Sequence, residues 1–267
     1  MSTPVDPTVL RYYADEFDEG ARLGSTALGP LELIRTRELL TALLPPAPAD
    51  VLDVGGGTGA HAAWMAADGY RVTVIDPVPR HVQQAAAIPG VHAVLGHAGE
   101  LPVPDDSADA VLLAGPLYHL PAAADRARAL AEACRVVRPG GLVAAVGISR
   151  HSELLELATL GTLDDDALER MRRVLVTGVH DGAAGFTLAY LHQWDELRAE
   201  LAIAGLRGVL VYGIEGPAAG AQRPPQPDPA RAKARLESVL RAARLVETEA
   251  QLVPSSPHLL AVGRLPD

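Results

Sequence analysis

Two residue types are almost missing from this sequence, and each scarcity excludes a class of chemistry. Cys134 is the only cysteine among the 267 residues, so the chain cannot form an internal disulfide. Lys233 is the only lysine, so a Schiff-base mechanism or a phosphate-gripping lysine has one candidate, and it lies in a polar helix. No run of about 18 apolar residues is free of charge and proline, so we expect no membrane span.

The N-terminal stretch and the charge balance narrow the class of protein further. Residues 1–20, MSTPVDPTVLRYYADEFDEG, have no basic start and no apolar core. We therefore expect no signal peptide and a cytoplasmic location. The content of hydrophobic residues, 48%, is typical of a folded domain, and the net charge of −10 argues against a nucleic-acid partner. We therefore expect no DNA partner and no membrane, and both a monomer and a homodimer stay open.

Short apolar segments alternate with helical segments between residues 50 and 149. The pattern predicts strands at DVLDVGG, RVTVID, VHAVLGH, DAVLLAG and LVAAVGIS, with helices between them at GAHAAWMAADG, VPRHVQQAAA and DRARALAEACRVV, the last ended by Pro-Gly-Gly. Alternation at this spacing is typical of a parallel sheet that is covered on both faces.

The flanking segments extend this α/β pattern within a single domain, residues 1–267. Residues 1–44 read as an N-terminal helical lid, 45–149 as the cofactor-binding half and 193–267 as the C-terminal part of the sheet. Residues 150–192 break the rhythm with two helices and a glycine-rich, irregular stretch at 179–192. We expect them to form an insertion that caps the substrate.

A burst of glycines follows the first predicted strand. Gly55, Gly57 and Gly59 alternate after Asp53, and glycines without a Cβ let a backbone turn tightly against a ligand. No lysine follows them, so this turn is not a P-loop. Open parallel sheets bind ligands at such a turn, outside the carboxyl ends of the strands.

An acidic residue at the end of the second strand indicates a nucleoside ligand. Asp76 lies about 20 residues beyond the turn, where a carboxylate can bind ribose hydroxyls. Gly55, Gly57 and Ala60 also satisfy the dinucleotide fingerprint G-x-G-x-x-G/A. The turn and the acid therefore leave both a nicotinamide dinucleotide and S-adenosylmethionine open.

Four ordered motifs favour the second ligand. The motifs are VLDVGGGTG, VTVIDPVPRHVQQA, GHAGELPVPDDSADAVLLAGPLYHL and EACRVVRPGGLVAAV. Through these four segments the chain resembles the class I S-adenosylmethionine-dependent methyltransferases, in particular a bacterial branch with GPLYHL after strand four. The resemblance is strong over residues 45–148 and looser over the last helix–strand–helix–strand. It implies a doubly wound, mostly parallel, seven-stranded sheet of the Rossmann-like methyltransferase kind, with N-terminal helices and a helical insertion.

The resemblance also implies roles for particular residues toward S-adenosylmethionine. The glycine turn would pass beneath the methionine part, Asp53 would steady the turn and the amino group, and Asp76 would hold the ribose. His97 stands where the family usually has an aspartate for the adenine amino group, so backbone atoms or Glu100 would replace it. Among residues before the sheet, Tyr13 could cover the cofactor and Arg22 could pair with its carboxylate. The expected cofactor-binding residues are Tyr13, Asp53, Gly55, Gly57, Asp76, Pro77, Ala98, Gly99 and Ala114.

The candidate catalytic residues are Tyr118, His119 and His192. Tyr118 and His119 follow strand four, where an acceptor must approach the methyl group, and a histidine there could take a proton or simply shape the wall. His192 and Tyr190, beside the insertion, could contact the substrate. No His/Cys/Glu cluster has ligand spacing along the chain, so we expect no metal.

These features together predict an enzyme that methylates a small molecule on oxygen, nitrogen or carbon. The transfer would be a direct SN2 displacement, in which alignment in a dry pocket is the main catalytic task. Three alternatives stay open at this point: a protein that holds the cofactor for a non-methylating reaction, a nicotinamide oxidoreductase, and an RNA methyltransferase.

Overall fold

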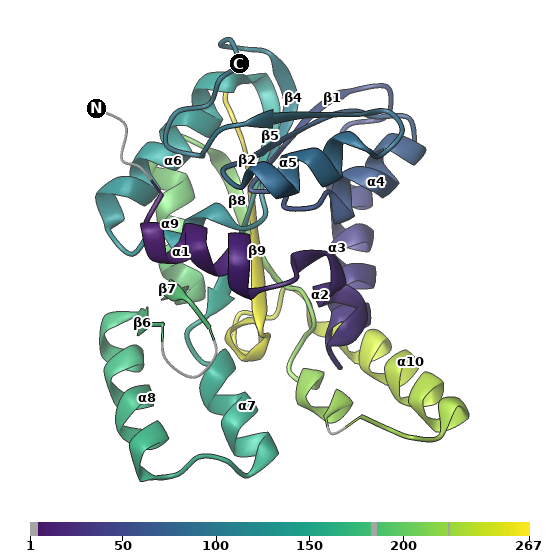
Figure 1. Ribbon diagram of the computed structural model, residues 1–267, viewed down its shortest axis with the longest axis vertical. Coiled ribbons are helices and arrows are strands. Elements are labelled where there is room, and N and C mark those ends of the chain that lie inside the picture. Colours follow the sequence, from purple (N-terminus) through teal and green to yellow (C-terminus); the bar gives the residue numbers. More distant parts are fainter. Residues whose placement is uncertain (1–4, 183–185, 224) are drawn as a thin grey trace.

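A computed structural model describes residues 5–182, 186–223 and 225–267, and a single sheet forms its centre (Figure 1). The order of the seven main strands is β3-β2-β1-β4-β5-β9-β8, and β9 runs antiparallel to both of its neighbours while the other pairs are parallel. The strands are β1 (Asp50–Val54), β2 (Arg71–Asp76), β3 (Val91–Leu95), β4 (Ala108–Leu113), β5 (Val137–Ser149), β8 (Arg207–Gly213) and β9 (His258–Arg264). The expected doubly wound, mostly parallel sheet is therefore confirmed.

Alternate residues of the strands face opposite layers of helices, which is why the sequence shows continuous apolar strands. Leu52 and Val54 of β1 face one layer, and Val51 faces the other. The first layer consists of α6 (Ala123–Val136) and α9 (Trp194–Ile203). The second consists of α3 (Gly29–Leu43), α4 (Ala60–Ala67) and α5 (Pro79–Ala86).

The N-terminal helices lie beside the carboxyl ends of the strands. They are α1 (Pro7–Arg11), the single π-type turn η1 (Tyr12–Glu16), α2 (Glu19–Ser25) and α3, so the prediction of helices before residue 45 is confirmed. Leu31 of α3 packs in a small core with Val239 and Leu240 of α10 (Pro229–Val246). This contact joins an N-terminal helix to the last long helix of the chain.

The region 150–192 differs in part from the prediction. Two helices are present as expected, α7 (Ser152–Leu160) and α8 (Asp165–Thr177), and Figure 1 shows them below the sheet. The stretch expected to be irregular is instead an antiparallel hairpin of β6 (Val179–Asp181) and β7 (Leu188–His192). β7 also pairs in parallel with the last two residues of β5, so the hairpin joins the sheet, which has nine strands among the described residues where seven were expected.

The boundary between α6 and β5 also differs from the prediction. The helix ends at Val136 and the strand begins at the next residue, so the Pro-Gly-Gly at 139–141 lies inside β5 and does not end the helix. There the register with β4 shifts between Ala108 and Ala110. Among the described residues, no helix is long and apolar enough to span a membrane.

Candidate active site

The glycine turn lies where the strand order reverses, between β1 and β4. Gly55, Gly57 and Gly59 all have positive φ, at 69°, 55° and 87°. A Cβ on Gly55 would lie 2.7 Å from the ring of Pro116, so that position has no room for a side chain. The turn therefore requires glycines for both conformation and space, and it exposes backbone amides ahead of α4.

Asp76, at the end of β2, holds this turn in place. Its Oδ2 accepts the amide of Gly57 at 2.9 Å, and its Oδ1 accepts the amide of Val78 at 2.9 Å and faces Nδ1 of His81 at 3.2 Å. The side chain is buried but borders the main cavity. Because a carboxylate offers about four lone-pair sites, Asp76 can position the turn and still accept a ligand's hydroxyls.

Asp53 lies directly beneath the turn. A Cβ on Gly56 would be 2.6 Å from Asp53 Oδ2, so the two are in close contact. The side chain is fully buried, and neither carboxylate oxygen has a hydrogen-bond partner among the described residues. Burial raises the pKa of this carboxyl from its usual 3.8 to about 7, and the charge of Asp76 adds to the rise. Asp53 is the one expected cofactor-binding residue that does not border the main cavity.

The main cavity runs from this turn to the N-terminal helices. Tyr13 of η1 borders it, and Arg80 of α5 holds η1 over it by donating to the backbone oxygens of Tyr13 at 2.9 Å and Phe17 at 3.1 Å. His97 also borders the cavity, whereas Glu100 is exposed and not among the lining residues. Of the expected cofactor-binding residues, eight line it: Tyr13, Gly55, Gly57, Asp76, Pro77, Ala98, Gly99 and Ala114.

The structure brings Tyr118 and His119 to the same cavity. Nε2 of His119 lies 2.9 Å from the hydroxyl of Tyr13, and its Nδ1 lies 3.3 Å from the carbonyl oxygen of Leu188 in β7. Burial lowers the pKa of His119 to about 4, and the Leu188 carbonyl and the Asp76 charge oppose this only in part. The ring is therefore neutral near pH 7, with Nδ1–H donating to Leu188 and Nε2 accepting from Tyr13.

The structure does not bring His192 to the cavity. Its side chain is fully buried, with Nε2 3.4 Å from Glu200, and it packs close to Gly147 of β5. The guanidinium carbon of Arg126 lies over the ring of Tyr190, 3.7 Å from the centre of that ring. Both residues are on β7, whose pairing with β5 turns these side chains into the core. The side chain of Arg22 lies outside the described residues.

Several lining residues carry no local sequence signal. Glu32 and Thr36 of α3 and Ile214, just after β8, border the cavity. Next to Ile214, Glu215 contacts His258, and Glu32 approaches the same pair. Because these positions are far apart in the chain, spacing along the sequence could not reveal the cluster.

Comparisons with known proteins agree with this geometry. Residues 52–145 match the methyltransferase domain family. The chain is 39% identical over 127 residues to an uncharacterized methyltransferase of Mycobacterium tuberculosis, covering 47% of this chain and 51% of that protein, so it spans about half the length of such relatives. It is 31% identical over 183 residues to the ubiquinone biosynthesis O-methyltransferase of a Methylobacterium species, covering 64% of this chain and 67% of that protein.

A solved structure shows the same fold over nearly the whole chain. An S-adenosylmethionine-dependent methyltransferase of Thermotoga maritima, described as a possible histamine N-methyltransferase, superposes with a TM-score of 0.61 at 18% identity. The match covers 96% of this chain and 97% of that one. With the sheet order, the glycine turn and these relatives, the chain belongs to the class I S-adenosylmethionine-dependent methyltransferases.

Proposed function

We propose that this protein transfers a methyl group from S-adenosylmethionine to a small molecule. The observation that carries the proposal is the pairing of two acids at one turn. Asp53 is buried beneath the glycines with no partner among the described residues, and Asp76 faces the cavity beside them. One acid suits the ligand's ammonium group, and the other suits its ribose hydroxyls.

The residues present fit this cofactor along the length of the cavity. Asp53 would attract the ammonium group from beneath the turn, directly or through water. Amides of the turn and of the first residues of α4 would face the methionine part. Asp76 would accept the ribose hydroxyls, and Pro77 with Ala98 would border the adenine. His97 lines the same end, where it would replace the family's usual aspartate.

At the other end, Tyr13 and His119 would manage the acceptor's proton. When bound, S-adenosylmethionine supplies a methyl group on a positively charged sulfur, which leaves as a neutral thioether. An O–H or N–H acceptor forms a bond to that methyl carbon and releases one proton. Nε2 of His119 would take this proton, directly or through the Tyr13 hydroxyl 2.9 Å away, and because its pKa is lowered to about 4 it would pass the proton on to water. The wall around them excludes water and aligns the acceptor.

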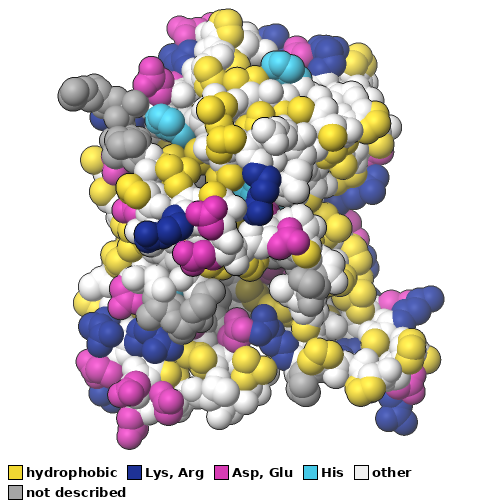
Figure 2. Space-filling view, in the orientation of Figure 1, with side chains coloured by type: hydrophobic (Ala, Val, Ile, Leu, Met, Phe, Trp, Pro, Cys, Tyr) yellow, Lys and Arg dark blue, Asp and Glu magenta, His cyan; other side chains and the backbone are white. Residues whose placement is uncertain are grey.

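Two features support a small acceptor over a nucleic acid. The cavity is bordered by side chains of α1, η1, α2 and α3, so the N-terminal helices form one wall of it. Figure 2 shows acidic side chains gathered at the lower end of α8, where Asp164, Asp165, Asp166 and Glu169 are exposed. Such a surface repels a phosphate backbone. A cytoplasmic location and a monomeric or homodimeric state stay predictions from the sequence.

Binding by an Asp76→Asn variant tests the cofactor assignment. Loss of charge-assisted hydrogen bonds to the ribose should weaken S-adenosylhomocysteine binding about 10- to 100-fold in calorimetry. Asp166→Asn, on the exposed surface of α8, is the matched control and should bind like the parent protein. Equal affinity in Asp76→Asn would contradict the assignment.

Label transfer tests the reaction itself. With tritium in the donor methyl group, phenols, hydroquinones and small amines should acquire label in proportion to the amount of protein. His119→Gln should lower the rate of transfer with little change in S-adenosylhomocysteine affinity, because it acts on the acceptor's proton. Transfer no faster than without protein, for every acceptor class, would contradict methylation.

A further inference from the structure

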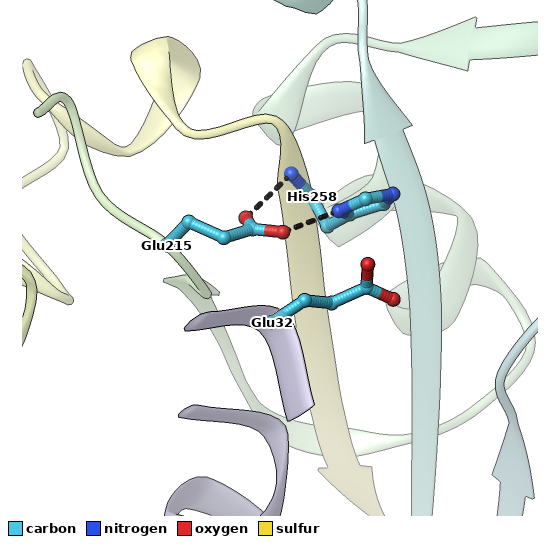
Figure 3. Close-up of side chains that lie close together, drawn as sticks. All are labelled: Glu32, Glu215 and His258. Carbon is cyan, nitrogen blue, oxygen red and sulfur yellow. Dashed lines mark hydrogen bonds and ion pairs between the residues drawn. The ribbon is translucent and has the colours of Figure 1, made fainter. Parts of the chain in front are cut away.

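Three side chains from distant parts of the chain meet beside the main cavity, which Glu32 borders. Glu32 comes from the first turn of α3, Glu215 from the loop after β8, and His258 from the first position of β9. Each offers one ligand atom, and these atoms all lie within 4.8 Å of one another. Figure 3 shows the side chains of Glu32 and Glu215 both extending toward His258.

Glu215 is held rigidly in this cluster. Its Oε2 accepts the hydroxyl of Ser256 at 3.0 Å and the amide of His258 at 2.9 Å, and its Oε1 accepts Nδ1 of His258 at 2.5 Å. The Ser256 oxygen in turn accepts the amides of Glu215 and Gly216 at 3.0 and 3.1 Å. Outer hydrogen bonds of this kind fix the orientation of metal ligands in proteins.

The local backbone supports the same arrangement. Gly216 has a φ of 74°, and a Cβ there would lie 2.9 Å from the backbone of Ala243 in α10. The chain must therefore turn sharply after Glu215, and the turn keeps this carboxylate fully buried beside His258. The position of Glu215 is thus set by the backbone before any ligand is present.

The donor chemistry of the cluster suits a cation. Two carboxylates face one imidazole, and the completely buried Glu215 pairs with Nδ1 of His258 at 2.5 Å. One imidazole nitrogen with two carboxylate oxygens is a donor set that first-row divalent metals accept.

The cluster is also open on one side. Glu32 borders the main cavity, as do its neighbours Thr36 and Ile214, whereas Glu215 lies behind them in the core. An ion held by the three residues would therefore have protein ligands on the core side and space on the cavity side. This open position distinguishes the cluster from a purely structural site.

We propose that Glu32, Glu215 and His258 form a binding site for one divalent metal ion that opens onto the cavity. On its cavity side the ion could bind an oxygen atom of the methyl acceptor. This role of the ion rests on the proposed function, whereas ion binding itself does not. The ion site itself can be tested without the methyl donor.

The test titrates the full chain with Mn²⁺ and with Zn²⁺ after treatment with a chelator, using calorimetry for both ions and electron paramagnetic resonance for Mn²⁺. We expect one saturable site per chain, with Zn²⁺ bound more tightly than Mn²⁺. Glu32→Gln should weaken Mn²⁺ binding at least about tenfold. This variant leaves the Glu215–Ser256 hydrogen bonds in place, and circular dichroism checks its fold.

Matched controls separate this site from adventitious binding. Glu249→Gln and His92→Asn alter exposed residues of the same types and should leave Mn²⁺ affinity unchanged. The proposal is overturned if no saturable Mn²⁺ or Zn²⁺ site appears, or if a folded Glu32→Gln variant binds like the parent. S-adenosylhomocysteine affinity, measured separately, reports on the proposed function, so failure of one does not imply failure of the other.

Discussion

Replacement of Asp53 by asparagine should change how stability depends on pH. The folded state raises the pKa of this carboxyl from 3.8 to about 7, so folding favours its protonated form. Between these values the folded chain holds a proton that the unfolded chain has lost, and stability therefore falls as the pH rises. Asparagine has almost the same shape and no such titration.

The size of the effect follows from the two pKa values. A shift of one unit corresponds to about 1.4 kcal/mol, so the titration of Asp53 lowers the free energy of unfolding, relative to low pH, by about 4 kcal/mol at pH 8 but only about 1.5 kcal/mol at pH 5. The stability of Asp53→Asn relative to the parent should therefore increase by about 2.5 kcal/mol from pH 5 to pH 8. Any constant effect of the buried amide cancels in this comparison.

Urea unfolding at the two pH values, in the absence of ligand, measures this difference. Asp166→Asn serves as the control, because its side chain is exposed and the substitution should show no comparable pH dependence. A relative stability of Asp53→Asn that is the same at pH 5 and pH 8, within about 0.5 kcal/mol, would refute the reasoning. It would mean that Asp53 has a partner or solvent in the folded state.

The same titration predicts a signature of ligand binding. At pH 6 most of the free protein carries a proton on Asp53, and an ammonium group beside it should drive that proton off. Binding of S-adenosylhomocysteine at pH 6 should therefore release about one proton, seen by calorimetry in buffers of different ionisation enthalpy. Asp53→Asn should release about one proton fewer than the parent.

Two further predictions concern the turn and the histidine. Gly55→Ala should destabilise the protein by about 2 kcal/mol or more in thermal or urea unfolding, because it combines positive φ with contact against Pro116, whereas Gly24→Ala, with open space around it, should not. If the stability of Gly55→Ala equals that of the parent protein, the turn tolerates a side chain and the reasoning is wrong. For His119, the pKa lowered to about 4 means that stability is lost as the pH falls below 6.5, by about 2.5 kcal/mol at pH 4.5. His119→Gln should lack this loss in urea unfolding at pH 7 and 4.5, and equal acid sensitivity in both proteins would count against a buried neutral ring.

Sequence patterns predicted most of the fold because the strands are buried on both faces. Continuous apolar runs such as residues 142–149 have few other interpretations once helices alternate with them. The hairpin of β6 and β7 was missed because its first strand has three residues and its glycines resemble a loop. Pairing with the end of β5, a distant contact, stabilises it.

The candidate site was predictable only where its residues follow one another along the chain. The turn after β1 and the acid at the end of β2 are local signals, so Gly55, Gly57 and Asp76 were expected at the site, and all three line the cavity. His192 was expected near the substrate because it lies at the end of the insertion, but the alternation of β7 directs it into the core. Glu215 and His258 meet only because β8 and β9 are neighbours in the sheet.

The carbonyl of Leu188 has a consequence for how this protein could diverge. It is a main-chain oxygen on an inserted hairpin, and it determines which nitrogen of His119 carries hydrogen. Exchange of side chains along the hairpin would thus leave the ring's tautomer intact. Natural variants could alter which molecules are admitted while keeping the same proton acceptor, so substrate choice and acid–base chemistry can evolve separately here.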